Sequence, residues 1–323
     1  MKGPARLPAA ARAIVDGDRR ALAQTISAVE NGDPSADPIV RALYARSGRA
    51  PVVGLTGPLG VGKSSIVNAL VGRLRSLGQT VGVIGVDPSS PFTGGSVLGD
   101  RIRLERRADD TGVFFRSMAS RGAAGGVAEA TREVSRLLDA AGFDVILVET
   151  VGSGQVDVAI RDIASTSIVV VVPHLGDEVQ TLKAGLFEIA DIFCVNKVDL
   201  PGAELAKRDL AELVMLGGRA SSWTPPIVGT STVDAKGIDE LWNAVVAHEK
   251  FLDVSGERTR GERARLSSEV VGLARERIGR ELMQRLERDP SLRRLLEDVL
   301  ARRIDPRTAA DRLATTSQRA RKR

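Results

Sequence analysis

The sequence predicts an α/β fold with a mostly parallel sheet, helices on both faces of the sheet, and helical extensions at both ends of the chain. Short β-branched runs recur through residues 50–250, and segments with helical spacing separate them. Such helices supply the long crossovers that parallel strands need. The extensions are predicted because residues 1–49 and 251–323 show helical spacing without β-branched runs.

The N-terminal region, residues 1–49, is expected to be a small helical region. Its apolar residues recur at helical spacing and include Ala9, Ile14, Leu22, Ile26 and Val29. An Asn-Gly-Asp-Pro break at residues 31–34 separates them from a second short periodic stretch over residues 39–44. The region therefore reads as two short helical pieces that precede the sheet.

The strands of the central region, residues 50–250, are expected where apolar β-branched residues cluster. These clusters cover residues 52–56, 81–86, 145–149, 168–172, 192–196 and 227–229. Helical spacing is found between them, for example over residues 64–77 and 126–141. The run at 167–172 shows no polar alternation, which is typical of a central strand buried on both faces.

The C-terminal region, residues 251–323, is expected to form a helical arm. Between residues 262 and 288 the apolar residues recur near a 3.6-residue period. Asp-Pro pairs at 289–290 and 305–306 interrupt the pattern. Because this apolar stripe has no partner within its own span, we expect the arm either to fold back on the sheet or to dimerise with a second subunit.

Composition narrows the class of protein. The chain has 323 residues, of which 43% are hydrophobic and 27% are charged, as in ordinary globular proteins. No apolar run approaches the roughly 18 residues of a membrane span. One cysteine and two histidines fit a reducing compartment and disfavour a soft-metal store. We expect a cytoplasmic protein that binds neither membrane nor nucleic acid, since the basic stretch at residues 257–323 interleaves acidic residues and lacks aromatic ones.

The strongest motif follows the first predicted strand and precedes a predicted helix. It matches the phosphate-binding P-loop pattern, in which two glycines flank four residues and Lys-Ser follows. Glycines let backbone N–H groups converge on phosphate oxygens, and the helix N-terminus adds partial positive charge. Lys63 is expected to bridge the β- and γ-phosphates, and the Ser64 hydroxyl to bind Mg²⁺. The nucleotide-binding residues predicted here are Gly57, Pro58, Leu59, Gly60, Val61, Gly62, Lys63, Ser64 and Ser65.

The identity of the base is predicted from Asn196-Lys197-Val198-Asp199, placed at the end of the strand expected at 192–196. The Asp199 carboxylate can accept two hydrogen bonds from the guanine N1–H and exocyclic amine, a pair that adenine lacks. The Lys197 stem can lie over the purine face. After the next strand, Thr230-Ser231-Thr232 lies in a loop whose backbone N–H is expected to meet the guanine O6, with Ser231 and Thr232 as the binding residues. The sequence therefore predicts GTP and GDP as ligands rather than ATP.

Carboxylates at strand ends predict the metal side of the site. Glu149 ends the strand expected at 145–149 and reaches the carboxyl edge of the sheet, where Mg²⁺ should lie. Asp87, at the end of another strand, is read either as a metal ligand or as a turn or cap residue. Asp100 lies in the loop that follows, and the metal-ligand interpretation is slightly favoured for it.

Gly152 and Gln155, which follow Glu149 in the sequence, are candidates for contacts with the γ-phosphate and the attacking water. The backbone N–H of Gly152 can approach the γ-phosphate, and Gln155 either orients the attacking water or caps a loop. Arg116 and Arg121 are weaker candidates for an arginine finger. Without one, hydrolysis loses roughly 10³ to 10⁵ in rate, so slow turnover is expected.

Several further segments resemble the MeaB family, also labelled ArgK, of GTPases associated with methylmalonyl-CoA mutase. They are Val86-Asp87-Pro88-Ser89-Ser90-Pro91, Thr93-Gly94-Gly95-Ser96, Leu98-Gly99-Asp100-Arg101, Glu149-Thr150-Val151-Gly152, Gly176-Asp177-Glu178-Val179-Gln180 and Lys183-Ala184-Gly185. The resemblance covers residues 50 to about 245 well, and the flanking helical regions agree in pattern only. It departs from the family at Pro173-His174-Leu175 and at 116–120, which leaves several acyl-CoA mutases as candidate partners.

The resemblance implies a specific biology. It implies a homodimer formed through the C-terminal arm and paired with an adenosylcobalamin-dependent acyl-CoA mutase, whose cofactor loading it gates and which it protects. It also implies that Ser64, Asp87, Asp100 and Glu149 form or support the Mg²⁺ site. Residues 174–183 would relay the state of the nucleotide, and Lys183 would dock on the nucleotide when the mutase is bound.

Two other functions are weighed against this one. A metallocentre-insertion GTPase of the nickel-chaperone type would need His- or Cys-rich segments, which this chain lacks. A P-loop kinase would have no use for the guanine-reading motif at Asn196. Among isolated residues, we expect Cys194 to be a small core residue, Trp223 and Trp242 to pack on the sheet domain, and His248 to face solvent.

Overall fold

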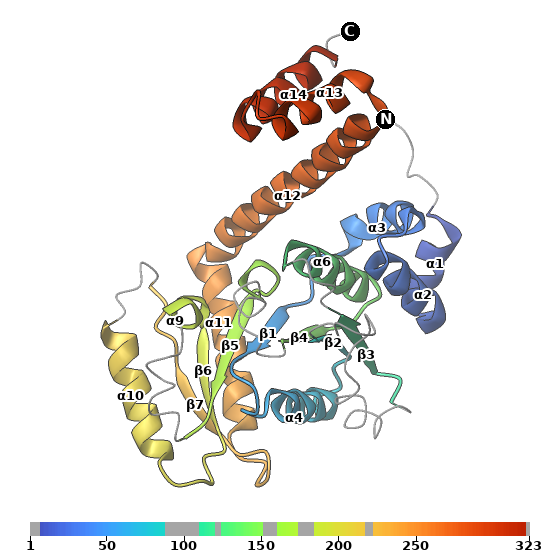
Figure 1. The fold of residues 1–323 in the computed structure, drawn as a ribbon. Coiled ribbons are helices and arrows are strands. Elements are labelled where there is room, and N and C mark those ends of the chain that lie inside the picture. The colour runs from blue at the N-terminus through green and yellow to red at the C-terminus, as the bar shows by residue number, and fades with distance from the viewer. Residues whose placement is uncertain are drawn as a thin grey trace. The chain divides into compact units, whose positions relative to one another are not determined.

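A computed structural model describes residues 7–87, 110–119, 124–150, 160–173, 184–216 and 222–320 (Figure 1). The chain divides into two compact units, Met1–Arg260 and Gly261–Arg323. The first holds the sheet with its surrounding helices, and the second holds most of the C-terminal arm. No helix within the described ranges is both long and apolar enough to cross a membrane.

Within these described residues the sheet has seven strands, all parallel, in the order β3-β2-β4-β1-β5-β6-β7 (Figure 1). The strands are β1 (Val52–Thr56), β2 (Val81–Asp87), β3 (Val113–Ala119), β4 (Val145–Thr150), β5 (Thr166–Val171), β6 (Ile192–Asn196) and β7 (Ile227–Thr230). Every predicted strand is present. Residues 166–171 form a central strand, β5, in which each residue is buried, as the absence of polar alternation over residues 167–172 predicts.

Strand β3 was not predicted from the sequence, because Arg116 and Ser117 interrupt its apolar run. It is the edge strand, and Arg116 is paired there with Glu30 of the N-terminal helix α2 (Arg19–Glu30). The Arg116 guanidinium also donates to the Ser27 hydroxyl at 2.9 Å. The interpretation of Arg116 as part of a switch loop, free to act as an arginine finger, is therefore wrong.

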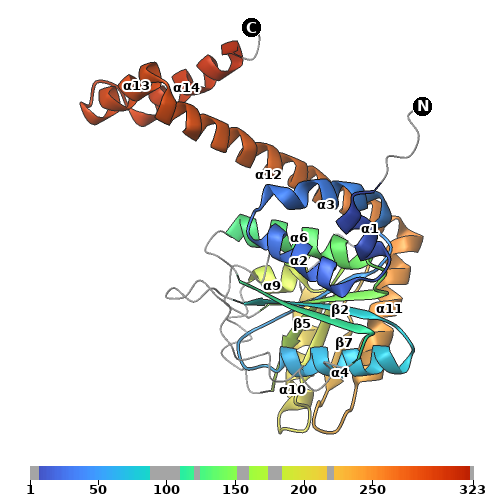
Figure 2. The same ribbon diagram turned by 90° about the vertical axis from the view of Figure 1, so that its right-hand side faces the viewer.

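Helices cover both faces of the sheet (Figure 2). On one face, α4 (Lys63–Ser76) and α11 (Ile238–Ser255) bury residues such as Leu70 and Leu241 against β1 and its neighbours. On the other face lies α6 (Ala124–Ala140), with α9 (Ala184–Ile189) and α10 (Ala203–Leu216) farther along the sheet. The two-faced arrangement agrees with the predicted α/β class.

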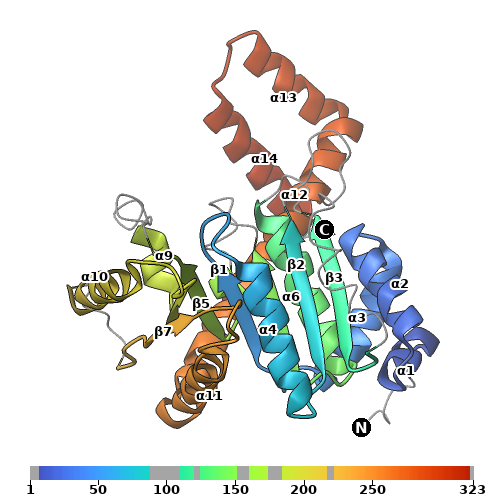
Figure 3. The same ribbon diagram turned by 90° about the horizontal axis from the view of Figure 1, so that it is seen from below.

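The N-terminal helices extend the second layer beside α6 and the β3 edge (Figure 3). They are α1 (Ala9–Val15), α2, α3 (Asp37–Leu43) and the short 3₁₀ helices η1 (Pro34–Ala36) and η2 (Tyr44–Arg46). Asp18 caps α2 by accepting from the backbone N–H groups of Arg20 and Ala21 at 2.9 and 3.0 Å. The buried face of α1 and α2 joins the same core cluster as α6.

The arm consists of α12 (Glu257–Arg288), α13 (Pro290–Leu300) and α14 (Pro306–Ala320). α13 and α14 begin at Pro290 and Pro306, so the two Asp-Pro pairs interrupt the helical pattern as predicted, because proline cannot continue a helix but is tolerated at its first position. Within this unit, α13 and α14 pack together and bury Leu292 and Ala309. Apolar side chains along α12 are exposed, among them Val270, Ile278 and Met283.

His248 on α11 was expected to face solvent, and the structure corrects that expectation. The residue is 3% exposed, with Nδ1 2.8 Å from the Thr166 hydroxyl and Nε2 3.7 Å from Asp191 Oδ1. It follows Leu241 and Val245 on the buried face of α11, so the helical spacing carried the signal. The expectations for Cys194, Trp223 and Trp242 are confirmed: the thiol and the Trp242 ring are buried, and the Trp223 ring lies 4.9 Å from that of His248.

The buried imidazole predicts a pH-dependent stability. Burial lowers the pKa of His248 below its usual 6.5, and the carboxylates of Asp191, Glu249 and Glu257 only partly oppose this, while Arg258 adds to it. The unfolded chain therefore takes up a proton that the folded chain resists. The resulting stability is full above about pH 6.5 and is lost as the pH falls below it, by at most ~1.4 kcal/mol per pH unit.

Urea unfolding of the wild type and of His248→Asn between pH 5 and 8 measures this contribution. Asparagine keeps a hydrogen-bonding group near Nδ1 but does not titrate. We expect the free energy of unfolding to fall more steeply below pH 6.5 in the wild type than in the variant. Equal slopes in the two proteins would contradict the assignment to His248.

Candidate nucleotide-binding site

The predicted phosphate loop connects β1 to α4, and glycines shape it. Gly57 has φ +140° and Gly62 has φ +92°, values that side-chain-bearing residues rarely adopt. A Cβ at Gly57 would lie 2.2 Å from the Val170 carbonyl oxygen, and one at Gly62 would lie 2.5 Å from Asn196 Nδ2. The loop therefore packs directly against β5 and against the end of β6. It delivers the N-terminus of α4, with its partial positive charge, to the carboxyl edge of the sheet.

Lys63 is the first residue of α4, and its side chain bends back into the loop. Its Nζ donates to the carbonyl oxygens of Gly57 and Pro58 at 2.6 and 2.8 Å. The residue is 6% exposed, so the position of its ammonium group is well defined by the loop. A fixed positive charge inside a curve of backbone groups suits a polyphosphate.

Ser64 and Glu149 meet on the next side of the site. The Ser64 hydroxyl donates to Glu149 Oε1 at 2.5 Å, and Glu149 is 9% exposed near the end of β4. A hydroxyl and a carboxylate are the hard oxygen ligands that Mg²⁺ prefers, so the pair fits that ion. Of the four predicted metal-site residues, the structure brings these two together.

The remaining predicted residues on this side lie partly or wholly outside the described residues. Asp87 ends β2, which pairs with β4, so its backbone is at the same edge of the sheet as Glu149. Its side chain is outside the described residues, as are Asp100, Gly152, Gln155 and Lys183. Their predicted roles stay predictions.

The residues predicted to read the base also hold the phosphate loop. Asn196, the last residue of β6, donates through Nδ2 to the Val61 carbonyl at 2.8 Å and accepts at Oδ1 from the Thr230 hydroxyl at 3.1 Å. Lys197 donates through Nζ to the Gly60 carbonyl at 3.0 Å. Asp199 lies just beyond and is exposed. The phosphate motif and the base motif thus form one connected site.

The loop after β7 lies beside this motif, with one correction. The Ser231 N–H donates to the Lys236 carbonyl at 3.0 Å, and the Lys236 N–H donates back at 2.9 Å. The backbone N–H of Ser231 is therefore used within the loop and is not the donor predicted for the guanine O6, whereas the prediction for Thr232 stays a prediction. Thr230 was predicted only as part of this loop, and its hydroxyl bond to Asn196 was not predicted.

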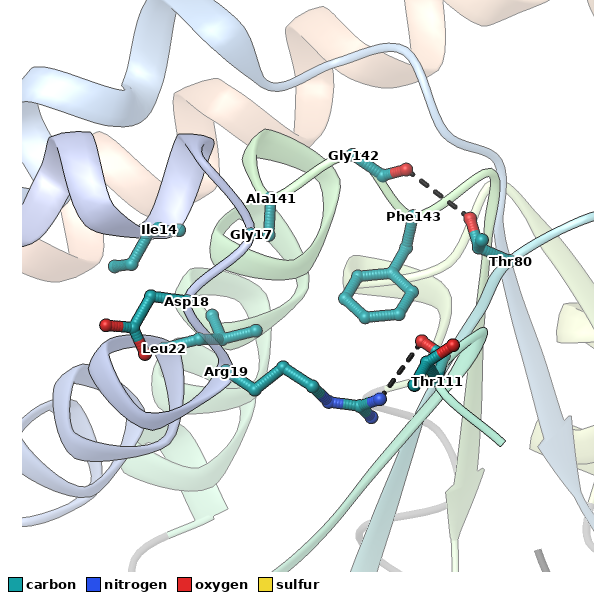
Figure 4. Close-up of a pocket in the computed structure, with 10 residues that line it drawn as sticks. All are labelled: Ile14, Gly17, Asp18, Arg19, Leu22, Thr80, Thr111, Ala141, Gly142 and Phe143. Atoms are coloured by element: carbon teal, nitrogen blue, oxygen red, sulfur yellow. Dashed lines mark hydrogen bonds between the residues drawn. The ribbon is translucent and has the colours of Figure 1, made fainter. Parts of the chain in front are cut away.

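A separate cavity of about 310 Å³ lies away from this site (Figure 4). It is lined by the junction of α1 and α2, by the segments that precede β2 and β3, and by the end of the α6 region. At its rim Arg19 donates to the Thr111 carbonyl at 3.0 Å. Because Thr80 and Thr111 stand before the strands begin, the cavity is at the amino edge of the sheet, opposite the phosphate loop. No predicted site residue lines it.

Comparisons with known proteins agree with this geometry. Residues 22–287 match the family model described as methylmalonyl Co-A mutase-associated GTPase MeaB. A protein of Pyrococcus horikoshii is 45% identical over 298 residues, covering 91% of this chain and 93% of its own length. The GTPase ArgK of Escherichia coli is 32% identical, covering 97% of both chains. The mouse methylmalonic aciduria type A homolog is 30% identical, covering 93% of this chain and 77% of its own length.

Among solved structures, one described as a LAO/AO transport system kinase has a TM-score of 0.73 to this chain. The sequence identity is 27%, and the match covers 98% of this chain and 99% of that one. The similarity therefore extends over the helical regions as well as the sheet.

Proposed function

This chain belongs to the MeaB family of GTPases, and from that premise we propose that it binds GTP with Mg²⁺, hydrolyses it slowly, and acts as the chaperone of a cobalamin-dependent acyl-CoA mutase. The observation that carries the proposal is the joining of the phosphate and base motifs. Lys63, Asn196 and Lys197 all bind carbonyl groups of the same loop.

The roles of the residues follow from their chemistry. Lys63 balances negative charge on the β- and γ-phosphates, and Asp199 accepts the two guanine N–H groups. Ser64 and Glu149 would hold Mg²⁺, which when bound neutralises developing charge on the phosphate oxygens. Asp87 and Asp100 would support that ion, the Gly152 N–H would contact the γ-phosphate, and Gln155 would orient water. The Arg116 guanidinium is already committed to Glu30 and Ser27, which supports slow turnover.

The partner is proposed from the family. Its model is named for association with methylmalonyl-CoA mutase, and the mouse relative is named for methylmalonic aciduria. We propose that residues 174–183, with Lys183, relay the state of the nucleotide to such a mutase. A homodimer through the arm is supported by the exposed apolar side chains of α12, Val270, Ile278 and Met283 among them.

A kinase is the second candidate, because the solved relative carries that name. A kinase transfers the γ-phosphoryl group to an acceptor, whereas a GTPase releases it to water. A nickel-chaperone GTPase is less well supported, since one of the two histidines and the one cysteine are buried in the sheet domain.

Phosphate release separates these functions. The purified chain is incubated with GTP or ATP, alone, with a cobalamin-dependent acyl-CoA mutase, or with candidate acceptors. We expect slow release from GTP only, with the mutase raising the rate on the order of tenfold or more, a modest part of what a partner-supplied arginine can give. Heat-denatured mutase is the control. A phosphorylated acceptor would favour the kinase, and the absence of stimulation by any mutase of the same cell would argue against the chaperone role.

A further inference from the structure

Two buried threonines join the ends of β1 and β4 next to the nucleotide site. The Thr150 hydroxyl donates to the Thr56 hydroxyl oxygen at 3.0 Å and lies 3.4 Å from the Leu55 carbonyl oxygen. Thr56 is 0% exposed and Thr150 is 2% exposed. Replacing both partners of a buried hydrogen bond by apolar groups of the same shape, here two valines, can be nearly neutral or even stabilising. The pair therefore calls for a role beyond filling space.

The position of the pair in the sheet suggests what it does. β1 and β4 are parallel neighbours, with Leu55 in register with Glu149, so Thr56 and Thr150 are the next residues along each strand. Thr56 directly precedes Gly57, the first residue of the phosphate loop. Thr150 directly follows Glu149, which bonds Ser64.

The side chains of Glu149 and Thr150 lie on opposite faces of the sheet and make different contacts. Successive side chains point to opposite faces of a sheet, so Glu149 and Thr150 face opposite layers. Glu149 reaches Ser64 on α4, while Thr150 reaches Thr56 on the α6 side. A bond on the α6 side thus fixes the strand end that presents the carboxylate on the α4 side.

We infer that Thr150 is a positioning residue of the nucleotide site. Through Thr56, its hydroxyl holds the end of β4 in register with the start of the phosphate loop. The Glu149 carboxylate then stays within hydrogen-bonding reach of Ser64. Sites of this kind depend on placement to within about 0.5 Å, which one buried side-chain hydrogen bond can decide. The inference rests on the proposed function and adds a residue to it.

The test compares nucleotide binding by matched variants. Thr150→Val removes the hydroxyl and keeps the shape, whereas Thr150→Ser keeps the hydroxyl. Thr56→Val and the double variant Thr56→Val/Thr150→Val complete a double-mutant cycle. Thr25→Val is the control, because Thr25 is also buried and its hydroxyl donates to the Ala21 carbonyl within α2 at 2.9 Å. GTP affinity is measured with and without Mg²⁺, beside the urea midpoint of each variant.

We expect Thr150→Val to weaken GTP binding about fivefold in Mg²⁺, the effect of one buried hydrogen bond, with a smaller change in its absence. Thr150→Ser should bind as the wild type does. The double variant should lose less affinity than the sum of the two single losses, since the two substitutions share the contact between the hydroxyl groups. Thr25→Val should lower only the urea midpoint. If Thr150→Val does not fold, Thr56→Val gives the same comparison.

The two ways of failing are distinct. A wild-type chain that does not bind GTP would overturn the proposed function. A wild type that binds GTP, together with a Thr150→Val variant that binds it equally well at a lowered urea midpoint, would overturn only the role assigned to Thr150. A Thr150→Ser variant that binds GTP as weakly as Thr150→Val would also contradict the role assigned to the Thr150 hydroxyl.

Discussion

Replacing Lys63 by alanine should lower the affinity of the chain for GTP by about 100-fold. The ammonium group is held by the carbonyls of Gly57 and Pro58 inside the phosphate loop, so its charge is in place before the nucleotide arrives. Hydrogen bonds to charged groups contribute about 1.5–3 kcal/mol each, and a phosphate oxygen is such a partner. Isothermal titration calorimetry with GTP and with GDP measures the loss.

Part of that loss would come from the loop itself, because the alanine variant leaves the Gly57 and Pro58 carbonyls without the Lys63 donor. Lys250→Ala is the matched control, since Lys250 lies on α11 and is exposed. We expect this control to bind GTP as the wild type does. A Lys63→Ala variant that binds GTP within about threefold of the wild type would show that the phosphates lie elsewhere.

Most of the sheet was predictable because its interior strands consist mainly of apolar, often β-branched residues. β1, β4, β5 and β6 are buried on both faces, which leaves mostly apolar runs without polar alternation in the sequence. β3 was not predicted because the charged residue Arg116 interrupts its apolar run. An edge strand tolerates this charge, since Arg116 forms an ion pair with Glu30 of α2, which is distant in the sequence. His248 escaped because a titratable residue was read as exposed, although Leu241 and Val245 precede it on the same face.

The same distinction holds for the site: features made by residues close in sequence could be predicted, and contacts between residues far apart in sequence could not. The phosphate loop was predictable because its glycines and Lys63 lie within one short segment of the sequence, residues 57–63. The contacts of Asn196 with Val61 and of Thr150 with Thr56 depend on strand order. The sequence does not reveal the strand order β4-β1-β5-β6, and without that order the neighbouring strand ends cannot be identified. Ser231 was misread for a related reason, since its bridge to Lys236 is a property of the folded loop.

Replacing Asp199 by asparagine should change which base the site prefers. A carboxylate accepts from both the N1–H and the exocyclic amine of guanine, whereas asparagine offers one acceptor and one donor. The amine of guanine would then face an amide N–H₂, while xanthine presents a carbonyl oxygen at that position. We expect the affinity for GTP to fall by at least about 100-fold, and that for XTP to rise above it, because unpaired polar groups in a reading site are costly.

Competition of GTP, XTP and ATP for the wild type, Asp199→Asn and the control Asp209→Asn measures this switch. Asp209 undergoes the same chemical change on α10, so the control should keep the wild-type order of bases. Lys63→Ala should weaken all three nucleotides together, since phosphate is common to them, whereas Asp199→Asn should reorder them. Retention of the GTP preference by Asp199→Asn would mean that another group reads the base. The contacts of Asn196 and Lys197 with the phosphate loop would then serve only to hold that loop in place.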